Sequence, residues 1–145
     1  MQMDPNNAVV KLCAQGMEAE AAGRMHEAKS LFEQAWGAAS DDYERCVAAH
    51  YVARHQDGPH ETLRWNEECL RYADRVADAR VAGFYPSLYL NLGHSHEELG
   101  DPRRAEEYYR SAEARLSALP DGPYADMVRD GVARGLARLS ANEPI

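Results

Sequence analysis

The chain has few cysteines, few lysines and few β-branched residues. Its three cysteines, Cys13, Cys46 and Cys69, are odd in number and widely spaced, which is typical of reduced thiols in a cytoplasmic protein rather than of a disulfide framework. The chain has 2 Lys and 14 Arg against 24 Asp and Glu in total. The resulting net charge of −8 argues against a nucleic-acid or anionic-membrane partner. No apolar run approaches the roughly 18 residues of a membrane span, and residues 1–7 show no export signal.

Motifs that carry chemistry are also missing. His94 and His96 stand two positions apart, so on a helix they point in different directions, and His50 and His55 are five apart, which suits a shared metal ion poorly. The sequence holds no Cys-x-x-Cys, no Gly-x-Ser-x-Gly and no phosphate-binding glycine loop. Cys13 lies on an inner helical stripe, where a small core residue is expected. We therefore predict no cofactor, no metal and no enzymatic activity.

Helix-forming residues dominate what is present. There are 24 Ala, against a single Thr and a single Ile, and this balance favours helices over strands. Asp4-Pro5, Gly58-Pro59, Asp101-Pro102 and Gly122-Pro123 are typical of helix starts. Pro86 falls inside the fifth helical pattern, so that helix either kinks there or begins anew. The pattern predicts seven helices, at about 5–22, 25–39, 41–56, 59–77, 80–99, 102–118 and 123–140. The Arg and Ala bias indicates a GC-rich genome, and we expect a bacterial source.

Two segments repeat without a gap at an offset of 77 residues. The paired positions are Gly16 with Gly93, Gly23 with Gly100, Ala28 with Ala105, Phe32 with Tyr109, and Ala35 with Ala112. Each small residue has a mechanical role in this spacing: the first Gly admits a close neighbour, the second ends a helix in the left-handed conformation, and the Ala residues permit tight crossing. The aromatic residue fills the gap between the two helices.

This spacing resembles the tetratricopeptide repeat, a helix–turn–helix unit of about 34 residues. The later copy is the better match, with Tyr89, Leu92-Gly93, His96 and the Gly100-Asp101 turn. The resemblance implies an all-α fold in which antiparallel helix pairs stack in a right-handed superhelix. It implies a single domain over residues 1–145, with units at about 9–42, 43–85 and 86–119, a longer and degenerate middle unit, and a capping helix at 123–140.

The resemblance also implies a concave groove lined by the first helix of each unit. Its positions hold mostly apolar residues with a few polar groups, which suits an extended segment or an amphipathic helix. The register of the middle unit is open, since Cys46, His50 and Ala53 are an alternative set there. The Lys and Asn cluster with which some family members grip a carboxylate is largely missing. The predicted groove residues are Val10, Cys13, Met17, Glu20, Val47, Tyr51, Arg54, Ser87, Leu90, His94 and Glu97.

Three functions follow as hypotheses. The first is a cytoplasmic, non-catalytic scaffold that binds a protein or peptide in its groove. Self-association through Trp65, Tyr72, Tyr85 and Tyr89 is attached to it, although such aromatics also fill repeat junctions. The second is a helical module that senses a small molecule, which would require a closed pocket between the groove and the last helix. The third is a metal-dependent enzyme that uses His50, His94 and carboxylates.

Overall fold

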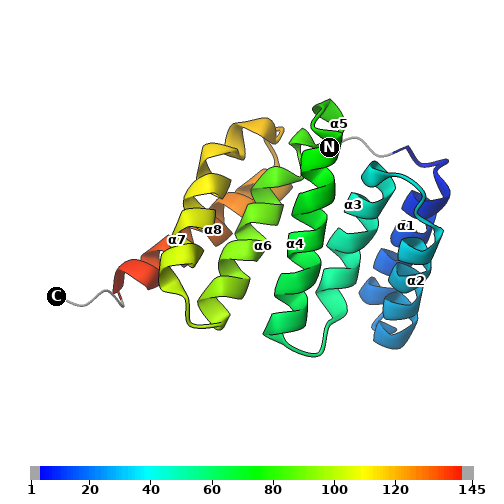
Figure 1. Ribbon diagram of the computed structural model, residues 1–145, viewed down its shortest axis with the longest axis horizontal. Coiled ribbons are helices and arrows are strands. Elements are labelled where there is room, and N and C mark those ends of the chain that lie inside the picture. The colour runs from blue at the N-terminus through cyan, green and yellow to red at the C-terminus, as the bar shows by residue number, and fades with distance from the viewer. Residues whose placement is uncertain (1–3, 142–145) are drawn as a thin grey trace. The chain divides into compact units, whose positions relative to one another are not determined.

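The computed structural model describes residues 4–141 and is all-α over that range, with no strand among the described residues. The chain forms two compact units, whose described parts are residues 4–81 and 82–141. The predicted all-α architecture of paired helices is confirmed (Figure 1). The prediction about the missing export signal concerns residues 1–7, of which residues 1–3 lie outside the described range.

Two antiparallel helix pairs build the first unit. Helix α1 packs against α2, α3 packs against α4, and α3 also contacts both α1 and α2. A 3₁₀ turn, η1, continues α3 toward the loop before α4. The bounds are α1 Ala8–Ala21, α2 Met25–Ala38, α3 Asp42–Val52, η1 Ala53–His55 and α4 Pro59–Val76, followed by the one-turn helix α5 Ala79–Ala82 at the unit boundary.

One helix pair and a third helix build the second unit. Helix α6 packs against α7, and α8 contacts both of them. Helix α8 buries a single stripe toward its neighbours and leaves its other side exposed, as expected of an amphipathic helix. The bounds are α6 Tyr85–Glu98, α7 Pro102–Ala114, the 3₁₀ turn η2 Leu116–Ala118 and α8 Pro123–Ala141. The buried stripe of α8 consists of Ala125, Val128, Val132, Gly135 and Leu139.

The small residues of the two segments that repeat at an offset of 77 have the packing roles that their spacing predicts. A Cβ placed on Gly16 would overlap the ring of Phe32, and one on Gly93 would lie 2.7 Å from Cδ1 of Tyr109. These two glycines therefore allow the aromatic residue of the second helix to lie directly on the first. The turn glycines have positive φ, 81° at Gly23 and 79° at Gly100. The close-crossing alanines of both copies are fully buried; they are Ala28, Ala35, Ala105 and Ala112.

Several helix boundaries differ from the predicted ones. Helix α1 begins at Ala8 instead of Pro5, because the side chain of Asn7 accepts hydrogen bonds from the amides of residues 9 and 10 and so acts as the cap. The predicted helix 80–99 is two helices, and α6 begins anew with Pro86 in its first turn. The predicted helices 41–56 and 102–118 end early, at Val52 and Ala114, and each continues as a 3₁₀ turn. Helix α4 ends at Val76, and its C-cap residue Ala77 adopts the left-handed conformation, with φ 49°, in which glycine is more usual.

Aromatic side chains fill the space between helices within each unit. Trp36 of α2 meets Trp65 of α4 edge-on at 5.0 Å and lies 6.0 Å from the ring of Tyr72. In the second unit, Tyr89 lies 5.6 Å from Tyr85. These four aromatics, offered above for self-association, thus have partners in their own unit, and self-association stays a prediction.

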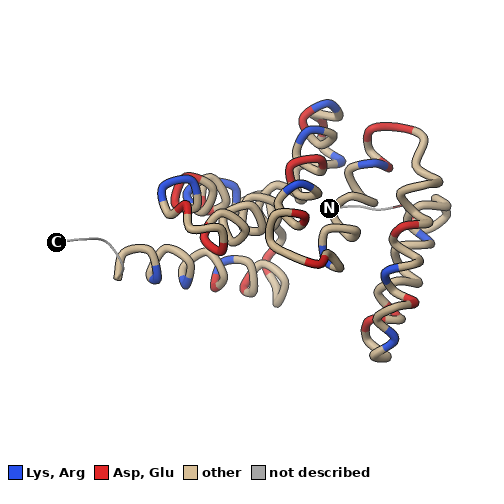
Figure 2. Tube along the Cα trace, turned by 60° about the horizontal axis from the view of Figure 1, so that its bottom comes forward, with Lys and Arg blue, Asp and Glu red and all other residues tan. Residues whose placement is uncertain are grey.

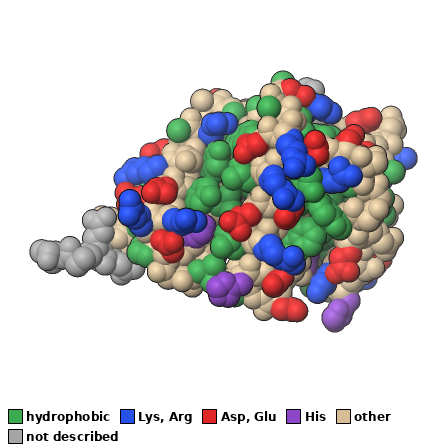
Figure 3. Space-filling model, viewed as in Figure 1, with side chains coloured by type: hydrophobic (Ala, Val, Ile, Leu, Met, Phe, Trp, Pro, Cys, Tyr) green, Lys and Arg blue, Asp and Glu red, His purple; other side chains and the backbone are tan. Residues whose placement is uncertain are grey.

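Charged residues are spread along the helices. Lys and Arg alternate with Asp and Glu along the trace in Figure 2. The face seen in Figure 3 likewise carries both signs close together, with hydrophobic side chains visible between them. Most ion pairs join residues three or four apart on one exposed helix face, for example Arg64 with Glu61 and Arg134 with Asp130. Pairs of this kind stabilise a helix only slightly.

Candidate functional site

The predicted groove residues of α6 form one stripe with graded exposure. Ser87 is buried, and its hydroxyl donates a hydrogen bond to the carbonyl of Phe84 at 3.3 Å. Leu90 and Glu97 are half-buried, and His94 is exposed. The exposed and half-buried members follow one another at spacings of three and four, which places them on one helix face. His96 points the other way, as predicted, and its buried ring stacks on Tyr108 at 5.4 Å.

A cavity of about 300 Å³ opens beside this stripe. Leu90 and His94, two of the predicted residues, line it together with Asn91. The structure adds a second wall from α8 that the sequence analysis did not assign to the site. The lining residues are Leu90, Asn91 and His94 of α6, Tyr109 of α7, and Gly131, Arg134 and Arg138 of α8.

The α8 wall could have been found from its spacing. Gly131, Arg134 and Arg138 stand three and four positions apart, so they share one face of the helix. Tyr124 and Met127 extend the same series toward the start of α8, and they are 41% and 63% exposed. Tyr124 and Met127 are two of the large hydrophobic residues that the described surface exposes, and they lie in line with Arg134 and Arg138. That line was the signal that the sequence analysis passed over.

Tyr109 forms the floor of the cavity, and its ring is packed between α6 and α8. Its ring lies against Gly93 of α6, and a Cβ on Gly135 of α8 would come within 2.5 Å of its Cζ. The hydroxyl donates a hydrogen bond of 2.7 Å to Oε1 of Glu97. Burial raises the pKa of Tyr109 above its ordinary value, and the bond to Glu97 raises it further. The phenol therefore stays protonated and acts as a fixed donor.

Glu97 ties the three helices of the unit together. Arg138 of α8 donates two hydrogen bonds to its carboxylate, from Nε at 2.8 Å and from a terminal nitrogen at 3.0 Å. These bonds, with a smaller contribution from Tyr109, hold the pKa of Glu97 below its ordinary range. The other charged groups at the cavity have only exposed partners: His94 lies 2.5 Å from Glu98, and Arg134 lies 3.0 Å from Asp130.

An equivalent arrangement stands in the first unit. Glu20, 77 residues before Glu97, receives His55 at 2.7 Å and Arg54 at 3.0 Å. The ring of His55 stacks on Phe32, the counterpart of Tyr109, at 5.6 Å. In both units a carboxylate on the first helix is thus bound by an arginine from a later element, beside the aromatic residue of the second helix.

The remaining predicted groove residues divide between core and surface. Cys13, Val47 and Tyr51 are buried, and burial raises the pKa of the Cys13 thiol to about 12. Val10 is half-buried, and Met17 is 45% exposed. Of the alternative register, Cys46 and Ala53 are buried, and His50 is partly exposed. The accessible surface of the groove residues predicted in this unit therefore comes chiefly from Met17, Val10 and Arg54.

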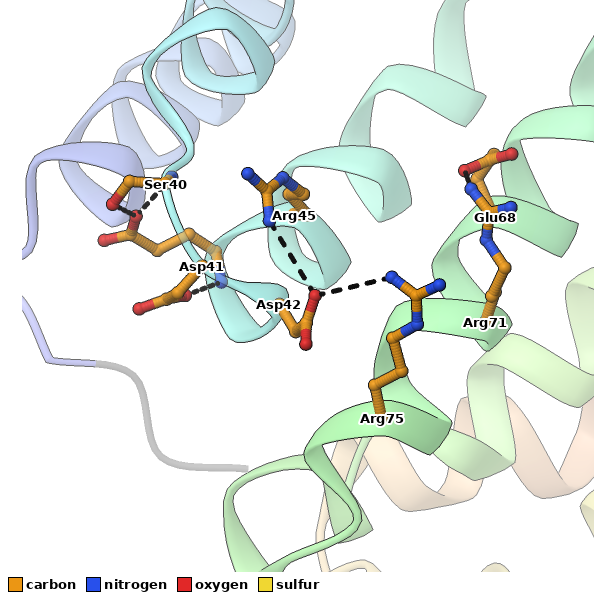
Figure 4. A network of polar contacts seen from close by, with 8 residues as sticks. Ser40, Asp41, Asp42, Arg45, Glu68, Arg71 and Arg75 are labelled. Atoms are coloured by element: carbon orange, nitrogen blue, oxygen red, sulfur yellow. Dashed lines mark hydrogen bonds and ion pairs between the residues drawn. The ribbon is translucent and has the colours of Figure 1, made fainter.

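A second cluster of polar groups surrounds the start of α3 (Figure 4). Asp41 caps the helix by accepting a hydrogen bond from the amide of Glu44 at 2.7 Å. Asp42 lies between Arg45 and Arg75, at 3.7 and 3.9 Å. Together these contacts fix the start of α3 and join it to α4, and we assign them a structural role. Among the described residues, no group of three or more His, Cys, Asp or Glu could hold a metal ion.

Comparison with known families identifies one segment. Residues 86–114 match the family model of the tetratricopeptide repeat. This segment comprises most of α6 and all of α7, the helices that carry one wall and the floor of the cavity. A comparison with curated proteins finds none that matches the chain. Within residues 4–141, no helix is long and apolar enough to cross a membrane.

The family match confirms the predicted resemblance over the later of the two repeated segments, the one that fits the motif better. Tetratricopeptide repeats are typical of protein-interaction scaffolds, and such repeats are usually not catalytic. The matched segment ends at the last residue of α7, so the α8 wall lies beyond the matched repeat.

Proposed function

We propose that the protein is a non-catalytic scaffold that binds a protein partner as an extended segment, and that the α6–α8 cavity is its main contact site. The observation that carries the proposal is the cavity itself, which two residues of the predicted groove line from α6 and two arginines line from α8. Its floor is rigid, because Tyr109 is packed between two glycines and hydrogen-bonded to Glu97. A preformed, mostly apolar hollow with a few polar groups on its rim is the usual form of a recognition site.

The experiment that tests this proposal reverses charge on the rim. His94 and Arg134 are 59% and 73% exposed, so the double variant H94E/R134E changes the cavity without disturbing the core. Arg103 is the matched control, since it is 90% exposed, lies on α7 and faces a carboxylate four residues away. Full-length protein is used for affinity purification from the native host, and the recovered partner is then purified and titrated directly.

The proposal expects the partner to bind the R103E variant as it binds the wild type. The H94E/R134E variant should bind about tenfold more weakly, because two charges beside the bound segment are reversed. Equal affinity of all three proteins would contradict the assignment of the site.

A small-molecule ligand is the second candidate. It is favoured by the position of the cavity between the predicted groove and the last helix, whereas the open form of the cavity differs from the closed pocket that this hypothesis requires. Its volume of about 300 Å³ is at the lower end of ligand pockets. Substitution of Asn91 by Arg would fill it. A metabolite that raises the melting temperature of the wild type but not of N91R would support this function over peptide binding.

A further inference from the structure

Two of the three cysteines touch each other inside the first unit. Cys46 lies on α3 and Cys69 on α4, and their Sγ atoms are 3.7 Å apart. Both residues are fully buried. The Cys69 thiol also donates a hydrogen bond to the backbone carbonyl of Cys46 at 3.3 Å, which places its sulfur against the neighbouring helix. The two helices that carry the pair pack along one another and are drawn side by side in Figure 1.

The geometry of this contact is close to that of a covalent link. A disulfide requires a sulfur separation of about 2.05 Å and two Cα atoms that lie within roughly 7 Å of each other in space. The Sγ atoms of Cys46 and Cys69 belong to different helices and lie 3.7 Å apart, so they must approach by roughly a further 1.6–1.7 Å to form the bond. Cys13 differs from this pair, because it lies on α1 and is buried there on a different helix.

We infer that Cys46 and Cys69 are an oxidative modification site, at which an intramolecular disulfide joins α3 to α4. The step breaks the two S–H bonds and forms one S–S bond. Two electrons and two protons pass to the oxidant; a peroxide is reduced to water, and an azo compound such as diamide is reduced to the hydrazine. The inference does not depend on the proposed partner binding.

Burial controls the rate of this step. The attacking species in thiol oxidation is the thiolate. The hydrogen bond with Cys46, together with burial, raises the pKa of the Cys69 thiol well above its ordinary value. Oxidation therefore waits for the α3–α4 pair to open. Conditions that loosen the unit, such as a low concentration of urea, accelerate it, whereas an exposed thiol would react at the same rate with or without urea.

The disulfide would stiffen the part of the first unit that carries the exposed Arg54. It closes a loop of 23 positions that contains η1 and the turn before α4. A cross-link of this span stabilises mainly by restricting the unfolded chain. The expected result is a rise in melting temperature of roughly 5–10 °C on oxidation, reversed by a reducing agent.

The test uses the full chain carrying Cys13→Ala, so that only the pair remains. The protein is treated with diamide, with and without urea below the unfolding midpoint, then alkylated and digested with trypsin without reduction. Cleavage after Arg places Cys46 in peptide 46–54 and Cys69 in peptide 65–71. We expect one linked species of these two peptides, with the mass of both less two hydrogen atoms, formed faster in urea and restored to free peptides by reductant.

The variants C13A/C46A and C13A/C69A are the matched controls. Each keeps one thiol of the pair, and each should show no intramolecular link and no oxidative rise in melting temperature. Far-UV circular dichroism on the same samples verifies that the helices are intact. The inference is overturned if the C13A protein, opened by urea and then returned to native conditions with diamide present, gives only free or intermolecularly linked peptides. It is equally overturned if the linked protein forms but loses its helical signal when urea is removed.

Discussion

Replacing Gly93 by Ala should destabilise the protein, although Ala is the better helix former. Gly93 lies inside α6, where Ala is normally favoured by up to about 1 kcal/mol. A methyl group at this position would lie 2.7 Å from both Cδ1 and Cε1 of Tyr109, well inside van der Waals contact. The result therefore depends on whether the ring can retreat.

The structure leaves the ring of Tyr109 no room. The ring is fully buried, and on its other side Gly135 approaches so closely that a Cβ there would be 2.5 Å from Cζ. The hydroxyl is held by Glu97 at 2.7 Å. Overpacking a well-packed core costs roughly 1–3 kcal/mol, and a ring fixed at three points belongs at the upper end of that range. After the gain in helix propensity of up to about 1 kcal/mol, we expect a net loss of about 1–2 kcal/mol in the free energy of unfolding.

Gly37 is the matched control for this substitution. It lies near the end of α2, and a Cβ there would meet nothing within 4 Å. Gly37→Ala should therefore raise the free energy of unfolding by about 0.5 kcal/mol, because only helix propensity acts. Urea unfolding followed by far-UV circular dichroism measures both variants, with the slope m compared to verify that the same surface unfolds. Stabilisation by G93A equal to that by G37A would refute the packing argument.

Three further outcomes are expected. Substitution of Asn7 by Ala removes the N-cap of α1 and should lower the free energy of unfolding by about 1 kcal/mol, as measured by urea unfolding. Asn6→Ala is the control, because Asn6 is the neighbouring residue and does not cap the helix. An equal effect of the two substitutions would contradict the cap assignment. Burial, with Arg54 adding to it, lowers the pKa of His50 to about 4. The unfolded state therefore binds more protons than the folded state between about pH 6.5 and 4, and the free energy of unfolding should fall by up to about 3 kcal/mol as the pH drops through that window. His50→Gln should abolish this pH dependence, and an unchanged pH dependence would exclude His50 as its source. Arg138→Gln removes the guanidinium whose hydrogen bonds, and to a smaller extent whose charge, lower the pKa of Glu97, so the carboxyl of Glu97 should titrate at higher pH by NMR. An unchanged titration would show that the ion pair does not form in solution.

The repeat could be predicted from the sequence because small residues at fixed spacing mark the places where its helices pack closely. Gly16 and Gly93 allow contact with Phe32 and Tyr109, and no other residue type fits in those places. The same spacing led to the predicted groove, and two of its residues, Leu90 and His94, line the cavity. These features follow from local periodicity, which a single sequence displays.

Other features depend on contacts between distant helices, and local spacing gives only a partial signal of them. The α8 wall becomes part of the site only when Gly131 of α8 comes beside Leu90 of α6, where a Cβ would lie 3.0 Å from the Leu side chain. The start of α1 was misplaced for a related reason. Asp4-Pro5 carries a strong local signal, yet Asn7 both caps the helix and donates a hydrogen bond to Glu44 at 2.8 Å, a residue 37 positions away.

The carboxylates of the predicted groove serve structure, and this directs recognition to other groups. Glu97 uses one oxygen for Tyr109 and both for Arg138. To contact a partner it would have to release the bonds that hold α6, α7 and α8 together. His94 and Arg134 form ion pairs with exposed carboxylates on their own helices, Glu98 and Asp130, and such pairs exchange readily with other ligands. An incoming segment should therefore place its polar contacts on His94 and Arg134, and its apolar side chain against the half-buried Leu90, because the ring of Tyr109 is fully buried.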